Sequence, residues 1–286
     1  MLRLFYLVVF AFAIVGFNAG CDAPPLPAPA GNANVATAER SPADDNAQSS
    51  RAVQASLQPP QIPDSFTFRP TFHTSSGDVP AGTAFAVTIP GESRLVLLSA
   101  IHLLGPMGGL EVDIPAEKVG TEVEELTLTP LFRGGEISLP ARAITIPGAS
   151  PMGSAATGPG DVVAFWLPPN DAFEPLTLAT ETPPAGTRVW LVASLVGGAP
   201  ASQRLHAARI TADEQTESLY YVFEESGLEM RATSGAPVVD SEGRVVAINL
   251  GGGEHKGRQF GVGNPVQRFR PALEKAMAAS PLAQER

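Results

Sequence analysis

The sequence predicts an all-β folded domain, and three observations support this prediction. The 286 residues include 28 Gly and 28 Pro, which favours many turns over a bundle of long helices. Short apolar or alternating runs, most of them 5–9 residues long, follow one another from Phe66 onward between Gly, Pro, Ser or Asp residues. No helical pattern separates these runs, as it would in a parallel α/β fold.

We expect strands where the runs are richest in Val, Leu, Ile, Thr or Phe. These ranges are Gly82–Ile89, Arg94–Ala100, Glu124–Phe132, Ala141–Ile146, Asp161–Leu167, Thr187–Leu195, Arg204–Ala212, Leu219–Glu224 and Arg244–Leu250. A further strand is expected just after Ser234, which lies in a glycine-bearing turn. The Gly251–Gly253 run is expected to be a flexible loop, because it lacks the continuation of a phosphate-binding loop.

One helix is expected, at the end of the folded domain. Asn264 can cap its N-terminus, and Pro265 suits the first helical position. The apolar residues that then share one helical face are Val266, Phe269, Leu273, Ala276 and Met277. We expect the helix to fray near Ser280 and to serve packing rather than chemistry.

The first 20 residues have the pattern of an export signal. Arg3 precedes an uncharged run of 14 residues, which is shorter than the roughly 20 that a membrane-spanning helix needs. Small residues then lead to Cys21, the only cysteine. This pattern resembles the lipobox of bacterial lipoproteins, although Asn18 replaces the usual Leu, and it implies lipidation of Cys21. An ordinary signal peptide with an incidental cysteine is the alternative.

The chain divides into four predicted segments. They are a lipoprotein signal peptide at 1–20, a disordered tether at 21–64, a folded domain at 65–279 and a tail at 280–286. Residues 22–64 include ten Ala and eight Pro but no aromatic residue, so they cannot bury enough apolar surface to offset their ordering entropy. Such a segment can hold a domain away from a membrane, or can be a simple disordered tail.

Charge and cysteine content exclude several classes of function. The formal charge is −10 without a basic run, and nucleic-acid binding depends on neutralising phosphates, so no nucleic-acid partner is expected. A single cysteine rules out an intrachain disulfide and a cysteine-based zinc site. No metal cluster and no cofactor signature is recognisable, so we expect no cofactor.

Three polar residues stand beside predicted strands. Ser99-Ala100-Ile101-His102 closes one strand, Asp161 begins another, and Thr233-Ser234-Gly235-Ala236-Pro237 forms the turn before a third. Taken singly, His102 could be structural, Asp161 could cap a turn, and Ser234 could lie in an ordinary turn. The other three histidines are assigned no chemistry: His73 and His255 look like loop residues, and His206 looks like a strand residue with a solvated face.

Together these segments resemble the motifs of trypsin-like (chymotrypsin-fold) serine proteases of the bacterial type, in the family's order. The resemblance covers about Phe66 to Ala278 and implies two packed antiparallel β-barrels with a C-terminal helix. It implies a triad in which His102 takes the proton of Ser234 and Asp161 orients the imidazole. The backbone N–H groups of Ala232 and Ser234 would form the oxyanion hole. The order His, Asp, Ser excludes the α/β-hydrolase arrangement.

Two departures from the family put the oxyanion hole in question. Ala232 replaces a Gly, and a left-handed conformation costs a non-glycine residue about 1–2 kcal/mol, so the peptide could turn away from the hole. Ala236 replaces the second Gly after the serine. Thr233 stands where animal members carry the Asp that pairs with a cleaved N-terminus, so we expect a domain that folds directly into its working form.

The resemblance also assigns substrate contacts. Asn249, Leu250 and Gly251 match the strand edge that pairs with a substrate backbone. Leu228, six residues before Ser234, matches a position that lines the specificity pocket, which favours an apolar over a cationic substrate residue. The leading hypothesis is an exported, lipid-anchored serine endopeptidase of the cell envelope, either periplasmic or on the outer face of a bacterial membrane. The alternatives are a catalytically weakened peptide-binding scaffold and a structural envelope lipoprotein.

Overall fold

The computed structural model describes residues 58–89, 91, 94–152, 158–211 and 217–280. The predicted signal peptide, Cys21 and most of the predicted tether lie outside the described residues. Within these ranges, no helix is both long enough and apolar enough to cross a membrane. Packing begins inside the stretch assigned to the tether, because Pro60 is buried and Asp64 forms an ion pair with Arg204.

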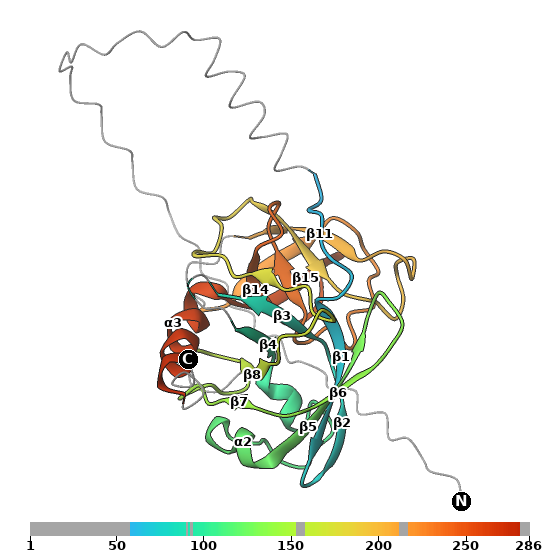
Figure 1. Ribbon diagram of the computed structural model, residues 1–286. Helices are drawn as coiled ribbons and strands as arrows, with labels where there is room; N and C mark the ends of the chain where they lie inside the picture. The colour runs from blue at the N-terminus through green and yellow to red at the C-terminus, as the bar shows by residue number, and fades with distance from the viewer. Residues whose placement is uncertain (1–57, 90, 92–93, 153–157, 212–216, 281–286) are drawn as a thin grey trace, which may run out of the picture. The chain divides into compact units, whose positions relative to one another are not determined.

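The first half of the domain is a nine-stranded sheet with the strand order β6-β5-β1-β3-β4-β8-β7, in which β2 pairs with β1 and β9 pairs with β3 (Figure 1). Among the described strands of this sheet, β3 and β9 form the one parallel pair. The strands are β1 (Thr67–Thr74), β2 (Gly77–Pro80), β3 (Ala84–Thr88), β4 (Leu95–Ser99), β5 (Val123–Pro130), β6 (Ile137–Pro140), β7 (Ala143–Ile144), β8 (Val163–Leu167) and β9 (Leu176–Thr177).

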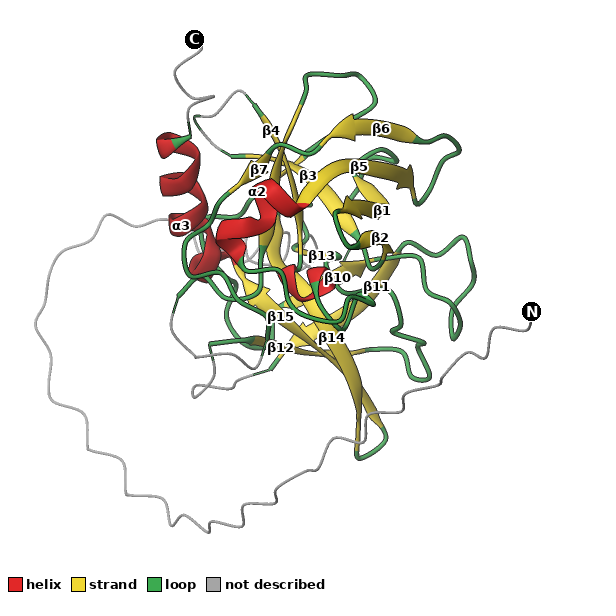
Figure 2. Cartoon of the chain, turned by 90° about the horizontal axis from the view of Figure 1, so that it is seen from below, coloured by secondary structure: helices red, strands yellow, loops and turns green. Residues whose placement is uncertain are grey.

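The second half is a closed antiparallel barrel with the order β10-β11-β12-β15-β14-β13. Its strands are β10 (Arg188–Val192), β11 (Leu205–Ile210), β12 (Leu219–Phe223), β13 (Pro237–Val239), β14 (Val245–His255) and β15 (Arg258–Pro265). Figure 2 shows β14 and β15 running together as a long ribbon that extends beyond the rest of the barrel. The prediction of two antiparallel β-barrel sheets with a C-terminal helix is confirmed, with the second sheet the closed one.

The described helices are short except for the last. They are η1 (Ile101–Leu104), η2 (Ala116–Lys118), α2 (Val119–Glu122) and α3 (Val266–Ala279). Helix α3 packs against β7, β14 and β15 through Val266, Phe269, Leu273 and Met277, as its apolar periodicity predicts. The expected cap is wrong, because Pro265 is the N-cap residue and no side chain caps the helix. The Asn264 side chain instead forms hydrogen bonds to the loop before β8.

All nine predicted strand ranges contain a strand, with shifted ends. Strand β14 continues through Gly251–Gly253 and pairs with β15, so the expectation of a flexible loop there is wrong. Strand β1 lies outside the predicted ranges, and Pro70 interrupts its alternating pattern. Pro70 lies between the two segments of β1 that pair with β3 and with β2, so its missing N–H leaves those ladders intact.

Candidate functional site

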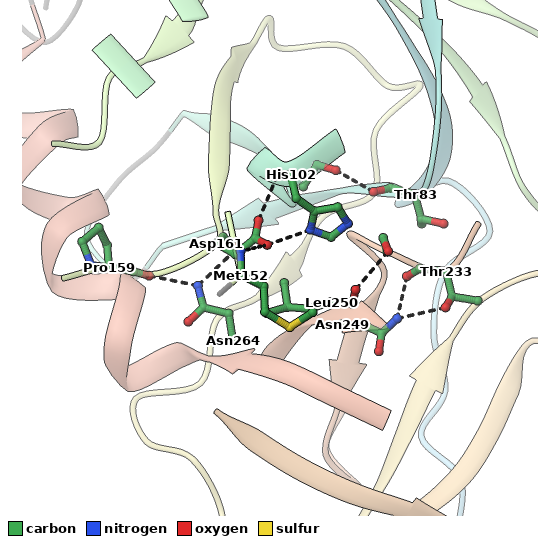
Figure 3. A network of polar contacts seen from close by, with 11 residues as sticks. Thr83, His102, Met152, Pro159, Asp161, Thr233, Asn249, Leu250 and Asn264 are labelled. Atoms are coloured by element: carbon green, nitrogen blue, oxygen red, sulfur yellow. Dashed lines mark hydrogen bonds and ion pairs between the residues drawn. The ribbon is translucent and has the colours of Figure 1, made fainter. Parts of the chain in front are cut away.

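The first part of the site is a buried acid–base pair at one end of the first sheet. Ser99 at the end of β4 pairs with Val163 at the start of β8, so the residues just outside these strands, His102 and Asp161, come together. His102 Nδ1 lies 2.7 Å from Asp161 Oδ2, and both side chains are at most 2% exposed (Figure 3). The His102 backbone N–H donates to Asp161 Oδ1 at 3.1 Å.

The two imidazole nitrogens have different surroundings. Nδ1 of His102 faces a carboxylate oxygen, which accepts hydrogen bonds, so Nδ1 is assigned as the donor to Asp161 and Nε2 is the nitrogen left available. Nε2 is buried and has no hydrogen-bond partner among the described residues. An oriented imidazole with a free basic nitrogen is the arrangement that a general base requires.

Two further contacts fix the loop that carries Asp161. The Met152 N–H donates to Asp161 Oδ2 at 2.9 Å. The Asn264 side-chain amide donates to the carbonyls of Pro159 at 2.9 Å and Asp161 at 3.2 Å, as Figure 3 shows. Asn264, expected to cap the helix, therefore ties the end of β15 to the loop that bears the acid. Neither contact has a sequence motif by which it could have been found.

The second part of the site is the turn that carries Ser234 in the second barrel, between β12 and β13. Gly235 has φ +84°, and a Cβ built on it would lie 2.0 Å from the Thr83 carbonyl oxygen. Gly82, with φ +69°, lies similarly close to the Ser234 carbonyl, which would be 2.6 Å from a Cβ. Both positions require glycine, because any side chain there would collide with backbone.

A set of hydrogen bonds joins this turn to the first sheet. The Thr83 N–H donates to the Ser234 carbonyl at 2.8 Å, and Thr83 Oγ1 donates to the Ala232 carbonyl at 3.0 Å. Ser99 Oγ in turn donates to the Thr83 carbonyl at 2.7 Å. Thr83 and Ser99, to which the sequence assigned no separate role, therefore hold the turn that carries Ser234 beside β4, which ends three residues before His102.

The Ser234 hydroxyl donates to the Leu250 carbonyl at 3.1 Å. No hydrogen bond joins Ser234 to His102 among the described contacts. Ser234 is partly exposed, unlike the buried His102 and Asp161. The structure therefore brings together two of the three predicted triad side chains by a direct hydrogen bond, and places the third on a turn that is tied to the same sheet.

Ala232 adopts the left-handed backbone conformation that is unfavourable for a residue with a Cβ. Its φ is +62°, and it is one of two non-glycine residues with positive φ in the described part of the chain. Its carbonyl is held by Thr83. The backbone N–H groups of Ala232 and Ser234 donate to no other protein group in the described ranges. The positive φ of Ala232 therefore costs about 1–2 kcal/mol. The N–H groups of Ala232 and Ser234 are left without a partner among the described residues.

Of the residues predicted to contact substrate, Asn249 and Leu228 are buried, whereas Gly251 is partly exposed. Asn249 is fully buried, and its backbone N–H and carbonyl are bonded to Ala236 and Gly235 at 2.7 Å each, so it supports the turn instead of offering an edge. Gly251 is partly exposed on β14, beside Leu250. Leu228 is buried with 4% exposure, and the next N–H along the chain, that of Glu229, donates to the Gly197 carbonyl.

The remaining histidines lie in strands, which corrects the expectation for His73 and His255 and part of the expectation for His206. His73 belongs to β1 and His255 ends β14, so neither is a loop residue. His206 lies in β11 as expected but is only 1% exposed, so it has no solvated face. Burial lowers the pKa of His206, although the Ala193 carbonyl and Glu225 oppose this effect.

A curled antiparallel sheet and a closed antiparallel barrel, followed by a C-terminal helix, form the fold of chymotrypsin-like serine proteases, and this chain has that fold. The thermostable serine protease AL20 from an extremophilic microorganism has a similar structure, with a TM-score of 0.51 and 14% sequence identity over 76% of this chain and 99% of that one. Human heparin binding protein has the same TM-score and identity, over 76% and 93%.

The HtrA-type protease AlgW, solved with a tripeptide, has a TM-score of 0.45 and 14% identity over 81% of this chain. This chain spans 64% of the length of that structure. No protein-family model matches the sequence. No curated protein matches it either.

Proposed function

We propose that this chain is an exported serine endopeptidase, anchored by lipid at Cys21, that hydrolyses peptide bonds with His102, Asp161 and Ser234. The observation that carries the proposal is the buried Asp161–His102 hydrogen bond of 2.7 Å, which leaves Nε2 of the imidazole free. The chymotrypsin-like fold supports it independently.

Each residue has a defined chemical role in this mechanism. Ser234 attacks the substrate carbonyl while His102 Nε2 takes its proton and gives it to the leaving amine, which leaves an acyl group on Ser234 Oγ. Water then attacks this ester, with its proton taken by His102 and returned to Ser234 Oγ, and the acid product leaves. Asp161 keeps the imidazole oriented and stabilises its cation. The mechanism requires the Ser234 hydroxyl to leave the Leu250 carbonyl and donate to His102 instead. The free N–H groups of Ala232 and Ser234 then stabilise the oxyanion.

The substrate is a protein or peptide bound as an added strand. Gly251 and the Leu250 carbonyl offer backbone groups on β14 for this pairing. A substrate N–H that bonded the Leu250 carbonyl would displace the Ser234 hydroxyl from it. We place an apolar substrate residue near Leu228 and Gly251, and we exclude Asn249 from direct contact because its polar groups are used internally.

The location follows from the N-terminal sequence. Lipid on Cys21, followed by the tether at 21–64, would hold the domain at a membrane of the bacterial envelope. Fractionation of cells that express the full chain tests this directly. The wild type is expected with the membranes and Cys21→Ser in the soluble fraction, whereas identical distributions of the two chains would refute lipid anchoring.

Covalent labelling tests the catalytic proposal. A fluorophosphonate probe is expected to modify the folded protein at Ser234, identified by peptide mapping, and His102→Ala is expected to abolish the labelling. Casein cleavage should be lost in both Ser234→Ala and His102→Ala. A folded wild-type protein that takes no label would contradict the proposal.

A second candidate function is a peptide-binding scaffold without effective catalysis. Two observations favour it: Ser234 Oγ donates to Leu250 instead of His102, and Ala232 occupies a strained backbone position. One structure of this fold carries a name that refers to heparin binding and not to proteolysis. Saturable binding of peptides from a library, with no cleavage and no labelling of Ser234, would support this second function over the first.

A further inference from the structure

A fully bonded asparagine lies beneath the turn that carries Ser234. Asn249 on β14 is 0% exposed. Its side-chain amide donates both hydrogens to Thr233, one to the carbonyl at 2.8 Å and one to Oγ1 at 2.9 Å, as drawn in Figure 3. A carbonyl can only accept, so the Thr233 carbonyl fixes which end of the amide faces the turn. The opposite end, Oδ1, accepts a hydrogen bond from the Tyr221 hydroxyl at 2.5 Å.

Tyr221 anchors this chain of contacts in the interior of the barrel. It lies in β12 and is 0% exposed, so its hydroxyl cannot reach a substrate. Burial raises the pKa of Tyr221, which keeps the hydroxyl protonated as a donor. Gly261 on the adjacent strand leaves the space for the ring, since a Cβ there would lie 2.3–2.6 Å from the ring and hydroxyl atoms.

Thr233 connects Asn249 to Ser234 and Ala232, whose groups are proposed to react. It stands between Ala232, whose φ is +62°, and Ser234. Its hydroxyl donates to the Met230 carbonyl at 2.7 Å while accepting from Asn249. Rotation of the Thr233–Ser234 peptide would therefore break the contact of its carbonyl with Asn249, and this peptide carries the Ser234 N–H of the proposed oxyanion hole. The Ala232 N–H lies between this peptide and the Met230 carbonyl, which the Thr233 hydroxyl holds.

We propose that Tyr221 and Asn249 are positioning residues, which through Thr233 hold Ser234 and the N–H groups of Ala232 and Ser234 in the geometry needed for peptide hydrolysis. This inference rests on the proposed protease function. It assigns to a buried phenol, remote from substrate, control over the chemical step.

Tyr221→Phe tests the inference because it removes only the hydroxyl. The rate of Ser234 labelling by the fluorophosphonate and the kcat of peptide hydrolysis should fall about tenfold, with KM little changed, since a hydrogen bond that holds the transition-state geometry is lost. The matched control is Tyr220→Phe, the neighbouring, partly exposed tyrosine without a contact to Asn249, which should retain both rates. Circular dichroism at the assay temperature establishes that each variant is folded.

Thr233 provides the second test, independent of how well Tyr221→Phe folds. Thr233→Ser keeps the hydroxyl and should label at nearly the wild-type rate, whereas Thr233→Val loses it and should fall about tenfold. Equal labelling of Thr233→Val, Thr233→Ser and the wild type would overturn the positioning role and leave the protease function standing. A wild type that takes no label would overturn both.

Discussion

Asp161 accepts three hydrogen bonds, two from His102 and one from Met152, whereas Ser234 uses its hydroxyl on the carbonyl of Leu250. His102 and Asp161 are thus already joined in the geometry that the proposed mechanism requires, and both side chains are at most 2% exposed. The turn that carries Ser234 is partly exposed. Its conformation depends on Ala232, Gly82 and Gly235, which all have positive φ, and on the hydrogen bonds from Thr83.

For the proposed peptidase, this difference predicts which substitutions change the rate of hydrolysis most. The pairing of β4 with β8 brings His102 and Asp161 together, and Met152 and Asn264 hold the loop that carries Asp161. The nucleophile turn needs contacts from both halves of the domain, so small changes in its backbone alter the direction of the Ser234 hydroxyl and of the oxyanion donors. Substitutions of His102 or Asp161 should therefore abolish catalysis. Substitutions in the turn that carries Ser234 should reduce the catalytic rate by smaller factors or destabilise the fold.

The largest effect is expected for Asp161→Asn. An amide at this position can donate to His102 Nδ1 and select the wrong tautomer, so the rate of peptide hydrolysis should fall about 10³–10⁴-fold. Asp171→Asn, an exposed acid of the same segment, is the control and should retain the rate. A loss of less than tenfold in Asp161→Asn would mean that the pair does not act as the base.

Gly235→Ala should have the next largest effect, on stability. Its Cβ would lie 2.0 Å from the Thr83 carbonyl, so the variant carries both a collision and an unfavourable φ, together about 3 kcal/mol of unfolding free energy. Gly186→Ala is the matched control, because Gly186 has φ +85° but open space around it, and it should cost about 1–2 kcal/mol. Equal losses of unfolding free energy in the two variants, measured by urea unfolding, would show that Gly235 is not closely packed against the Thr83 carbonyl.

Ala232→Gly should have the smallest effect. Relief of the strain at φ +62° is partly offset by the entropy of glycine in the unfolded chain, which leaves a gain of about 1 kcal/mol. The labelling rate should change by less than about twofold, because the N–H direction is already set. Lys256→Gly, at the other non-glycine residue with positive φ, should show a similar gain in stability. A large rise in labelling for Ala232→Gly would indicate that Ala232 distorts the oxyanion hole.

The sequence was sufficient for the elements whose signal is local. Strand runs such as Leu95–Ser99 are continuous and apolar, and helix α3 has clear periodicity, so both were predicted. Strand β1 lies outside the predicted ranges, and Pro70 argues against a central strand unless the change of partner there is known. The continuation of β14 through three glycines depends on pairing with β15, which no local pattern encodes.

The site shows the same division. His102, Asp161 and Ser234 are recognisable because each stands in a motif beside a strand. The contacts of Tyr221 and Thr83 join residues far apart in sequence, so their roles emerge only from the folded chain. Asn249 and Asn264 were assigned to substrate contact and to a helix cap, yet their amides bond the nucleophile turn and the acid loop.

In the proposed mechanism, the His102–Asp161 pair and the Ser234 turn complete one active site when Ser234 reacts. A crystal structure of the protein after modification by a peptidyl phosphonate tests this most directly. We expect a covalent bond to Ser234 Oγ, the loss of its contact with Leu250, and a phosphonyl oxygen about 3 Å from the N–H groups of both Ala232 and Ser234. An adduct whose oxygen lies away from these two N–H groups, or a folded protein that forms no adduct, would contradict this mechanism.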